Sequence, residues 1–258
     1  MTNVHLVGGL DIAELTFFAF FLFFLGLVWY LRREDRREGY PLETDAEGYI
    51  LDTNDALLFD RPKTFHLPHG FGDVTTPTAN ERDPLPTNII PPNRIYEGTP
   101  FEPASNPLSS GLGPASYAQR FDRPDVDMHG DPRIVPTRVA THIGPVAQDI
   151  DPRGLTVYGI DGAVAGTVSD LWVDKSEHML RYLEVDLAGG EGRVLLPMAM
   201  SEVSRKGVVT DSITAAQFAG APRTKSPDQV TLLEEDMIVG YFGGGYLWAT
   251  KERSEPYL

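Results

Sequence analysis

The sequence predicts one transmembrane helix near the N-terminus and a mainly β domain, a small antiparallel barrel, with a short C-terminal helix. Three observations predict this fold class. Residues 15–31 contain no charged side chain, and sixteen of the 21 prolines lie between Pro41 and Pro145. From about Gly154 onward, short runs alternate between apolar and polar residues, as half-buried strands do. The chain is therefore expected to have an anchor, a proline-rich middle and a β domain.

The predicted membrane span covers residues 12–31. At about 1.5 Å per residue this run forms a helix of about 30 Å, the thickness of a hydrocarbon core. Asp11 and Glu14 have the spacing of a capping box, which places the start of the helix at Ile12. Trp29 and Tyr30 have the amphipathic rings that favour the headgroup layer at the other end.

The charges beside the span predict its orientation. Four arginines follow it, at positions 32, 33, 36 and 37, and no lysine or arginine precedes it. Because positive residues stay on the cytoplasmic side, residues 1–11 are expected in the periplasm and the rest in the cytoplasm. The basic region and small-residue cleavage site of a signal peptide are missing, so a retained anchor is expected.

Phenylalanines cover most of the first half of the span. They are Phe17, Phe18, Phe20, Phe21, Phe23 and Phe24. Two interpretations remain open: apolar bulk that faces lipid, or packing against other membrane helices or flat pigments. The span has no pattern of small residues four apart, so the sequence does not indicate self-association through this helix.

Composition restricts the partners of the soluble part. A net charge of −15 argues against nucleic acid, because phosphate binding needs a basic face. Only the arginines after the span would be attracted to lipid headgroups. The absence of cysteine excludes disulfides and thiolate metal sites. The excess carboxylates either keep the protein soluble or hold protons near its surface.

The proline-rich segment, residues 32–150, has no sustained helical or strand period. It nevertheless has more apolar residues than disordered chains usually have. These residues are Phe59, Phe65, Leu67, Phe71, Ile89, Ile90, Ile95, Tyr96 and Phe101. An extended segment with such anchors is expected to lie along the surface of another protein.

Short strands are predicted from Thr156 to Tyr158 and over residues 163–173, on either side of an Asp161-Gly162 turn. Residues 182–187 alternate as well, with Leu183, Val185 and Leu187 predicted to face the core and Tyr182, Glu184 and Asp186 to face water. Further strands are predicted at residues 193–196, after a glycine pair, and at 208–210. Tight turns without βαβ spacing favour a small antiparallel barrel or sandwich.

A helix is predicted near the C-terminus. Thr231 and Glu234 have capping-box spacing, so the helix starts there. It is expected to run to about Val239 and to end at Gly240 or at the glycines of residues 243–245.

Motifs for catalysis are missing from the sequence. It has no Gly-x-Ser-x-Gly, no phosphate-binding glycine loop of the usual spacing and no His-Glu-x-x-His. His66 and His69 are spaced like a ligand pair but lie between prolines without a third ligand, so they are interpreted as loop histidines bonded to backbone. An enzyme is therefore not expected.

Two acidic groups are candidate sites. The first contains Asp122, Asp125, Asp127, His129 and Asp131. Carboxylates beside an imidazole can pass protons near neutral pH or hold a divalent cation, and they can also form a simple solvated loop. The second contains Asp174 and Glu177, with Arg181 one helical turn further on. Taken alone, that pattern indicates a surface ion pair.

Several longer strings carry a resemblance to a known family. They are the residues at 37–43, 62–70, 111–117, 172–174, 195–198 and 225–236. In these strings the chain resembles the H subunit of the purple bacterial photosynthetic reaction centre. The resemblance runs almost from end to end of the sequence.

The resemblance implies a cap on the cytoplasmic side of the L and M subunits, in the bacterial inner (intracytoplasmic or chromatophore) membrane. L and M would carry bacteriochlorophyll, bacteriopheophytin, quinones and non-haem iron, and this chain would bind no cofactor. Further partners would be a cytochrome subunit, a light-harvesting ring and membrane lipids. It also implies a β-barrel of the PRC type at residues 151–245 and a tail at 246–258.

The resemblance also implies a proton path to the secondary quinone. Asp127 and His129 match the surface residues of that path, and Asp131 stands where some relatives have a histidine, which leaves a divalent-ion site there in question. Asp174 and Glu177 match the inner acids, and Arg181 an arginine that pairs with and tunes them. Such acids are expected to have raised pKa values. The alternatives are a purely structural scaffold and an independent enzyme or signalling anchor.

Overall fold

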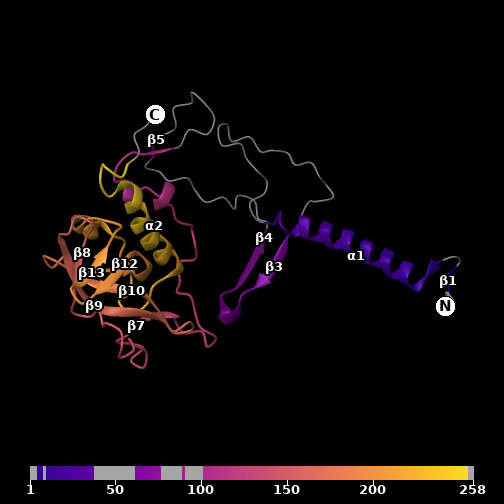
Figure 1. The fold of residues 1–258 in the computed structure, drawn as a ribbon, viewed down its shortest axis with the longest axis horizontal. Helices are drawn as coiled ribbons and strands as arrows, with labels where there is room; N and C mark the ends of the chain where they lie inside the picture. Colours follow the sequence, from indigo (N-terminus) through magenta and orange to yellow (C-terminus); the bar gives the residue numbers. More distant parts are fainter. Residues whose placement is uncertain (1–4, 8–9, 38–61, 77–88, 91–100, 255–258) are drawn as a thin grey trace. The chain divides into compact units, whose positions relative to one another are not determined.

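The computed structural model describes residues 5–7, 10–37, 62–76, 89–90 and 101–254. The chain divides into two compact units, residues 1–82 with 94–98 and residues 83–93 with 99–258 (Figure 1). Of the predicted apolar anchors, Phe59, Ile95 and Tyr96 lie outside the described residues, and so does most of the motif at 37–43.

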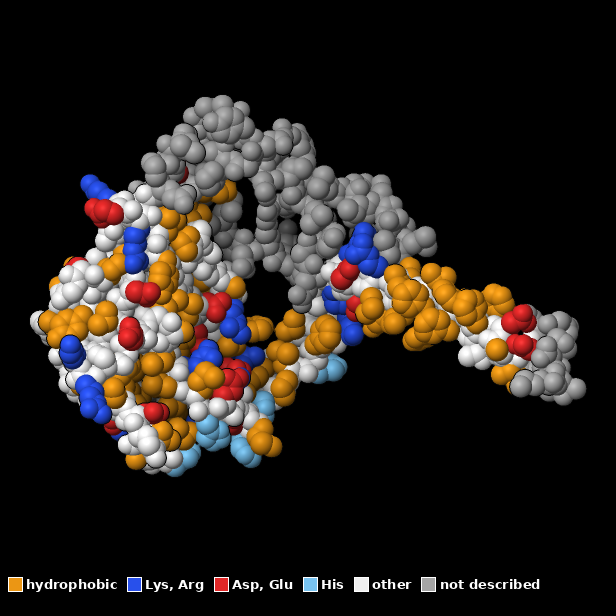
Figure 2. Space-filling model, viewed as in Figure 1, with side chains coloured by type: hydrophobic (Ala, Val, Ile, Leu, Met, Phe, Trp, Pro, Cys, Tyr) orange, Lys and Arg blue, Asp and Glu red, His pale blue; other side chains and the backbone are white. Residues whose placement is uncertain are grey.

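The first unit contains the apolar helix α1 (Ile12–Glu34), preceded by the short paired strands β1 (His5–Val7) and β2 (Leu10–Asp11). The predicted capping box is confirmed, since Asp11 and Glu14 each accept the other's backbone N–H at 2.9 and 3.2 Å. Hydrophobic side chains cover the helix (Figure 2). With 23 residues and a mean hydropathy of 2.2 in its most apolar stretch, α1 is long and apolar enough to cross a membrane.

The helix runs three residues past the predicted span, through the first two arginines. The Arg33 guanidinium lies 4.9 Å from the Trp29 ring and 5.8 Å from the Tyr30 ring, which holds the cation against the last turns. Positive charge at a helix C-terminus is also favoured by the helix dipole. The arginines therefore extend the helix instead of ending it.

A hairpin that the sequence did not predict joins β3 (Lys63–His66) to β4 (Asp73–Thr76) through the 3₁₀ turn η2 (Pro68–Gly70). His66 lies on β3, with Nδ1 2.7 Å from Asp73 Oδ1, and not in a loop. His69 lies in η2, in a left-handed conformation with φ of +58°. The two histidines are thus in different local structures.

The second unit is built on a seven-stranded sheet (Figure 1). Its strands are β7 (Ile134–Pro136), β8 (Thr156–Tyr158), β9 (Val164–Asp174), β10 (Met179–Leu187), β11 (Arg193–Pro197), β12 (Ser201–Ser204) and β13 (Gly207–Thr210). The order is β11-β10-β9-β8-β13-β12, and β7 also pairs with β9. A separate two-stranded sheet joins β5 (Ile89–Ile90) to β6 (Glu102–Pro103).

Most of the predicted strands and turns of this sheet are confirmed. Gly162, at φ of +70°, turns β8 into β9, and Gly189 and Gly190 turn β10 into β11. The pairing of β8 with β13 is parallel, so the prediction of a wholly antiparallel sheet was wrong there. The two edge strands of the sheet, β11 and β12, follow one another in sequence. The 3₁₀ turn η5 (Met198–Met200) connects them.

The main core lies between the sheet and the helix α2 (Leu232–Trp248), with the 3₁₀ segments η3 (Pro107–Ser109), η4 (Gly113–Ala115) and η6 (Ala215–Gly220) around it. Its largest fully buried side chains are Trp172, Phe218, Phe242, Leu171, Leu183, Leu196, Ile213 and Ile238. The predicted capping box at the start of α2 is confirmed, since Thr231 and Glu234 bond to each other's backbone N–H.

The predicted end of the C-terminal helix was wrong, because α2 continues through all four glycines to Trp248. A Cβ at Gly240 would lie 2.9 Å from the carbonyl oxygen of Ser116, and one at Gly243 2.7 Å from that of Pro114. The glycines therefore allow η4 and its flanks to approach the helix backbone closely. They serve packing between elements and do not end the helix.

The prediction that Tyr182, Glu184 and Asp186 on β10 face water was also wrong at two of these three positions. Tyr182 is 2% exposed and Glu184 is 3% exposed, whereas Asp186 faces water as expected. The Tyr182 hydroxyl donates to Glu235 on α2, and Glu184 is paired with Arg138 from the segment after β7. Elements distant in sequence thus cover both faces of β10.

Candidate functional site

The first acidic group of the sequence is divided among several places in the fold. Asp122 accepts a hydrogen bond from the Thr231 hydroxyl at 3.0 Å, at the start of α2. Asp125 lies 3.2 Å from a guanidinium nitrogen of Arg133. Asp127 lies on a short hairpin of its own, residues 126–132. The group is therefore not one uniform solvated loop.

The hairpin that carries Asp127 is closed by backbone hydrogen bonds. Asp127 N–H donates to the Asp131 carbonyl at 2.9 Å, and Gly130 N–H donates to the Asp127 carbonyl at 3.0 Å. Gly130 has a φ of +88°, a conformation that glycine adopts without strain. This turn fixes the backbone around the Asp127 carboxylate.

The Asp127 carboxylate is held in its ionised form. Its Oδ1 accepts the backbone N–H groups of His129 and Asp131 at 2.9 and 3.1 Å, and Lys175 Nζ lies 3.0 Å from Oδ2. The hydrogen bond from Lys175, helped by the two N–H groups and opposed by burial, lowers the pKa of Asp127 to about 2. The expected raised pKa is therefore wrong for Asp127.

His129 and Asp131 direct exposed side chains into solvent from the same turn. Within the described residues, no three His, Cys, Asp or Glu side chains converge closely enough to hold a metal ion. The divalent-ion site considered at Asp127, His129 and Asp131 is thus not assembled in this structure. The ammonium of Lys175 occupies the cation position beside Asp127.

Arg133, which the sequence analysis missed, organises the second acidic group. Its Nε lies 2.7 Å from Asp174 Oδ2, and its two terminal nitrogens lie 2.5 Å from Glu177 Oε1 and 3.2 Å from Asp125 Oδ2. One guanidinium therefore joins three carboxylates from two separate segments. Hydrogen bonding and charge from Asp174, and then Glu177, raise the pKa of Arg133 against the effect of burial.

The pairing of β7 with β9 brings Arg133 to these acids. Ile134 pairs with Asp174, and Lys175 N–H donates to the Arg133 carbonyl at 3.0 Å. A strand of three residues within a proline-rich stretch gives little periodic signal. The only sequence signal for Arg133 is its position close to the first acidic group, where it is a positively charged residue.

Asp174 is the most buried acid of the site, with 1% of its surface exposed. Burial alone would raise its pKa, but Arg133 and the backbone N–H groups of Glu177 and Ser176 outweigh burial and lower the pKa. The expected raised pKa is therefore wrong for Asp174 also. Glu177 has a side chain that is 49% exposed, so the pair reaches from the interior to the surface.

Arg181 has a different partner from the one expected. It lies on β10, not one helical turn from Glu177, and its guanidinium is 3.9 Å from Glu235 on α2. Among the described ion pairs, Arg133 occupies the place beside Asp174 and Glu177 that sequence reasoning gave to Arg181. Any tuning by Arg181 thus acts on Glu235.

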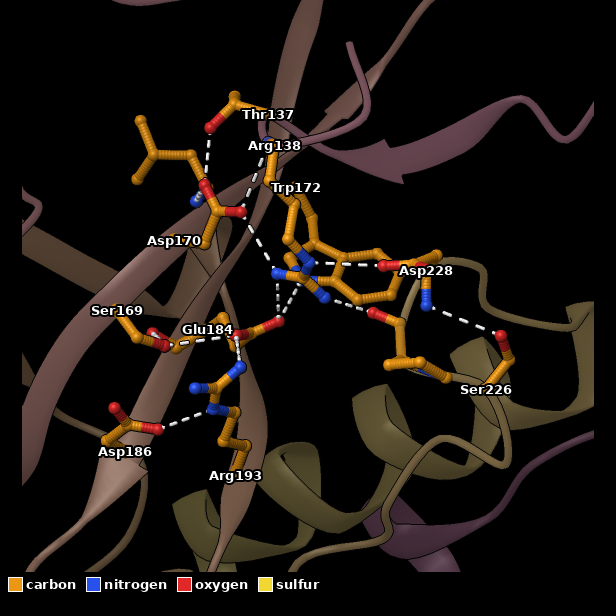
Figure 3. Close-up of polar contacts among 12 residues, drawn as sticks. Thr137, Arg138, Ser169, Asp170, Trp172, Glu184, Asp186, Arg193, Ser226 and Asp228 are labelled. Carbon is orange, nitrogen blue, oxygen red and sulfur yellow. Dashed lines mark hydrogen bonds and ion pairs between the residues drawn. The ribbon is translucent and has the colours of Figure 1, made fainter. Parts of the chain in front are cut away.

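A second charged network surrounds Glu184 on β10 (Figure 3). Glu184 accepts from Arg138 at 3.0 Å, Arg193 at 3.1 Å and the Trp172 ring nitrogen at 2.9 Å. Arg138 also bonds to Asp170 at 3.0 Å, an acid that is 7% exposed. These contacts satisfy the charges of two buried carboxylates, and they tie β9 and β10 to the segment after β7.

The lowered pKa of Asp127 predicts a loss of stability in acid. A carboxyl with a depressed pKa stabilises the fold above its ordinary pKa of 3.8 and loses that contribution as the pH falls toward about 2. Lys175→Met should return the pKa of Asp127 toward 3.8, so the thermal midpoint of the full chain in detergent should fall less steeply over this range than in the wild type. Lys206→Met, which removes an exposed lysine, is the control. Equal slopes in wild type and Lys175→Met would contradict the assignment.

Comparison with known proteins divides the chain in two. Residues 4–139 match the family model described as photosynthetic reaction centre, H-chain N-terminal region. Residues 148–217 match the PRC-barrel domain. Over 69 residues the chain is 36% identical to an uncharacterized protein of Deinococcus radiodurans, a match that covers 26% of this chain and 25% of that protein. The match thus spans about a quarter of that relative.

The apolar helix and the PRC-barrel match together indicate a class, the membrane-anchored proteins with a PRC-barrel. The first match covers more than half of the 258 residues. The chain therefore belongs to the H-chain family of the photosynthetic reaction centre.

Proposed function

We propose that this chain caps the cytoplasmic face of the L and M subunits in the bacterial inner membrane, with its N-terminus in the periplasm. The cap stabilises the complex and shields the quinone sites from bulk water, where competing reactions would occur. The chain itself holds no pigment, quinone or iron, which belong to L and M. The family match and the arginines that follow α1 support this proposal.

The cap also carries part of the proton path to the secondary quinone. One observation carries this step: two sets of ion-paired groups, adjacent in sequence at Asp174 and Lys175, lie between an exposed turn and an acid that is 1% exposed. Asp127 contacts Lys175, which follows Asp174 in sequence, and Arg133 joins Asp174 to Glu177. A reduced quinone in a shielded site needs such a route, because protons must reach it where water does not.

The residues of this path have different roles, which we infer from their ion pairs and exposure. Asp127 and Asp174 are ionised at neutral pH, so they act as fixed negative charges that attract protons. His129 is exposed beside Asp127, and an imidazole can take up and release a proton near neutral pH. We assign proton uptake to the surface turn that carries His129 and Asp127. Glu177, Asp131 and Arg181 stay in the proposed path as charges along its length.

Co-purification tests the assembly part of this proposal. After mild detergent extraction, an affinity tag on the C-terminus of this chain should bring down L and M, and the purified complex should show the near-infrared absorption of bacteriochlorophyll. A variant lacking residues 12–34, which form α1, should bring down less of L and M, so the recovered material should show weaker near-infrared absorption. If the full chain were recovered without bacteriochlorophyll-binding proteins, the reaction-centre assignment would be wrong.

A purely structural role is the second candidate, because the same ion pairs stabilise the fold. Variants of Asp127 and His129 distinguish this structural role from proton delivery. The measurement is the rate of the second electron transfer to the secondary quinone. A scaffold alone would lose assembly in damaged variants without a specific defect in protonation.

A further inference from the structure

A cavity of about 630 Å³ with mostly apolar walls lies between the sheet and the segment of residues 143–152. Leu171 and Val173 on β9, which are 1% and 4% exposed, line it from the sheet. Met198 of η5 and Val203 on β12 also belong to its lining. We call this cavity the apolar groove.

A second, smaller core supports the groove. It consists of Val135, Ala140 and Val173, each at most 4% exposed, with Ile143 and Leu180 packed against them. The backbone N–H of Ile143 also donates to the carbonyl of Ala140 at 3.0 Å, which fixes the start of the segment that forms the outer wall. The groove is therefore supported by packed side chains, and a ligand would find it largely formed.

Three large apolar side chains at the groove are open to solvent. Val146 is 59% exposed, Met179 50% and Ile150 37%, and all three belong to the lining of this one cavity. Single exposed apolar residues are common on protein surfaces, whereas a contiguous group of them marks an interaction site. The groove and these three side chains together form such a surface.

The groove lies beside the inner end of the proposed proton path. Asp174 is the last residue of β9 and Met179 is the first of β10, so the acids of the path and part of the groove belong to one hairpin. Glu177, with a side chain that is 49% exposed, lies between them. If this hairpin delivers protons to the quinone site of L and M, it must face those subunits, and the groove faces them with it.

Charge complementarity favours the same partner. Four arginines balance four acids in residues 1–37, so the residues after α1 carry the whole net charge of −15. Asp149 is the carboxylate in the described lining of the groove. Loops on the cytoplasmic side of membrane proteins have an excess of lysine and arginine. A loop of this kind that also carries an apolar side chain fits the groove in both charge and polarity.

We propose that the apolar groove receives a cytoplasmic loop of L or M, which inserts an apolar side chain against Leu171 and Met198 and places a lysine or arginine beside Asp149. This contact excludes water next to Glu177, where the proposed path leaves the subunit, so protons pass to the partner without leaking to solvent. The inference rests on the proposed function, and it names the surface by which the cap is held and sealed.

Affinity purification of the assembled complex tests the groove. Val146→Asp combined with Met179→Asp should lower the near-infrared absorption recovered per chain by about tenfold, because a carboxylate buried against apolar side chains weakens binding by this order. Asp149→Lys should lower it as well, since the new charge repels a basic loop. The matched control is Val164→Asp with Val209→Asp, at positions that are 53% and 45% exposed and lie outside the groove. It adds the same charge and should keep the wild-type recovery.

The thermal midpoint of each variant in detergent shows whether it is folded. Equal losses in the two double variants, or unchanged recovery with Val146→Asp and Met179→Asp, would overturn the inference while L and M still came down with the wild type. Recovery of the wild-type chain without L and M would instead reject the proposed function itself.

Photocrosslinking gives a second measurement that does not depend on the stability of a charged variant. A benzophenone amino acid in place of Val146 should crosslink to L or M when the assembled complex is irradiated, and the same group in place of Val164 should not. A crosslink from position 146 to a second copy of this chain, to another protein, or only to lipid or detergent would show a different occupant and overturn the inference.

Discussion

Replacing Asp127 by Asn together with His129 by Ala should slow the second, proton-coupled electron transfer to the secondary quinone by about tenfold or more, since a well-placed proton-transfer group contributes at least this much. The first charge separation moves no proton and should be unchanged. Asn at position 127 keeps an oxygen that can accept the backbone N–H groups of His129 and Asp131, so the turn should keep its shape. The effect would therefore report on protonation and not on folding.

The single variants separate the two tasks. His129→Ala removes the group that exchanges protons and should account for most of the slowing, whereas Asp127→Asn removes only a charge and should have a smaller effect. Met128→Ala, an 84% exposed position on the same turn, is the matched control and should behave as wild type. Proton-uptake kinetics that are unaltered in the double variant would reject the proposed relay.

Arg138→Met should destabilise the full chain by about 3 kcal/mol, the lower end of the range for breaking a buried ion pair by removing one partner. The variant leaves Asp170, 7% exposed, without its guanidinium, and it removes one of the two cations beside Glu184. The lower end applies because Arg193 stays in contact with Glu184 and because the Arg138 side chain is 34% exposed. Chemical denaturation of the purified protein in detergent measures the free energy of unfolding.

Arg153→Met provides a control with the same chemical change. Its partner Asp151 and Arg153 itself are both 44% exposed, so the loss should be about 1 kcal/mol or less. Adding Glu184→Gln to Arg138→Met should restore part of the stability, because it removes a buried charge that has lost a partner. Equal losses for Arg138→Met and Arg153→Met would show that the network in Figure 3 adds no stability through burial.

The elements that sequence reasoning predicted well are those with local causes. The start of α1 follows from Asp11 and Glu14, and the start of α2 from Thr231 and Glu234, because each capping box lies within four residues. The turn at Gly162 also follows from a short signal. These features needed no knowledge of the rest of the fold.

The parts that sequence reasoning missed depend on contacts between distant residues. Glycine at positions 243–245 favours a helix end locally, and only the approach of η4 to α2 explains why the helix continues. Glu184 was placed in water because its strand alternates, whereas Arg138, 46 residues away, covers it. Arg133 and Glu177 are 44 residues apart and meet only through the pairing of β7 with β9. No local pattern predicts these contacts.

The paired strand β7 has a consequence for how this protein can be divided. The PRC-barrel match begins at residue 148, yet Ile134 on β7 and Ile238 and Phe242 on α2, all outside that match, belong to the same core. A fragment cut at the limits of the match would leave apolar surface uncovered on both sides. The sheet and its flanking segments thus form one folding unit, and a fragment meant to fold alone must include β7 and α2.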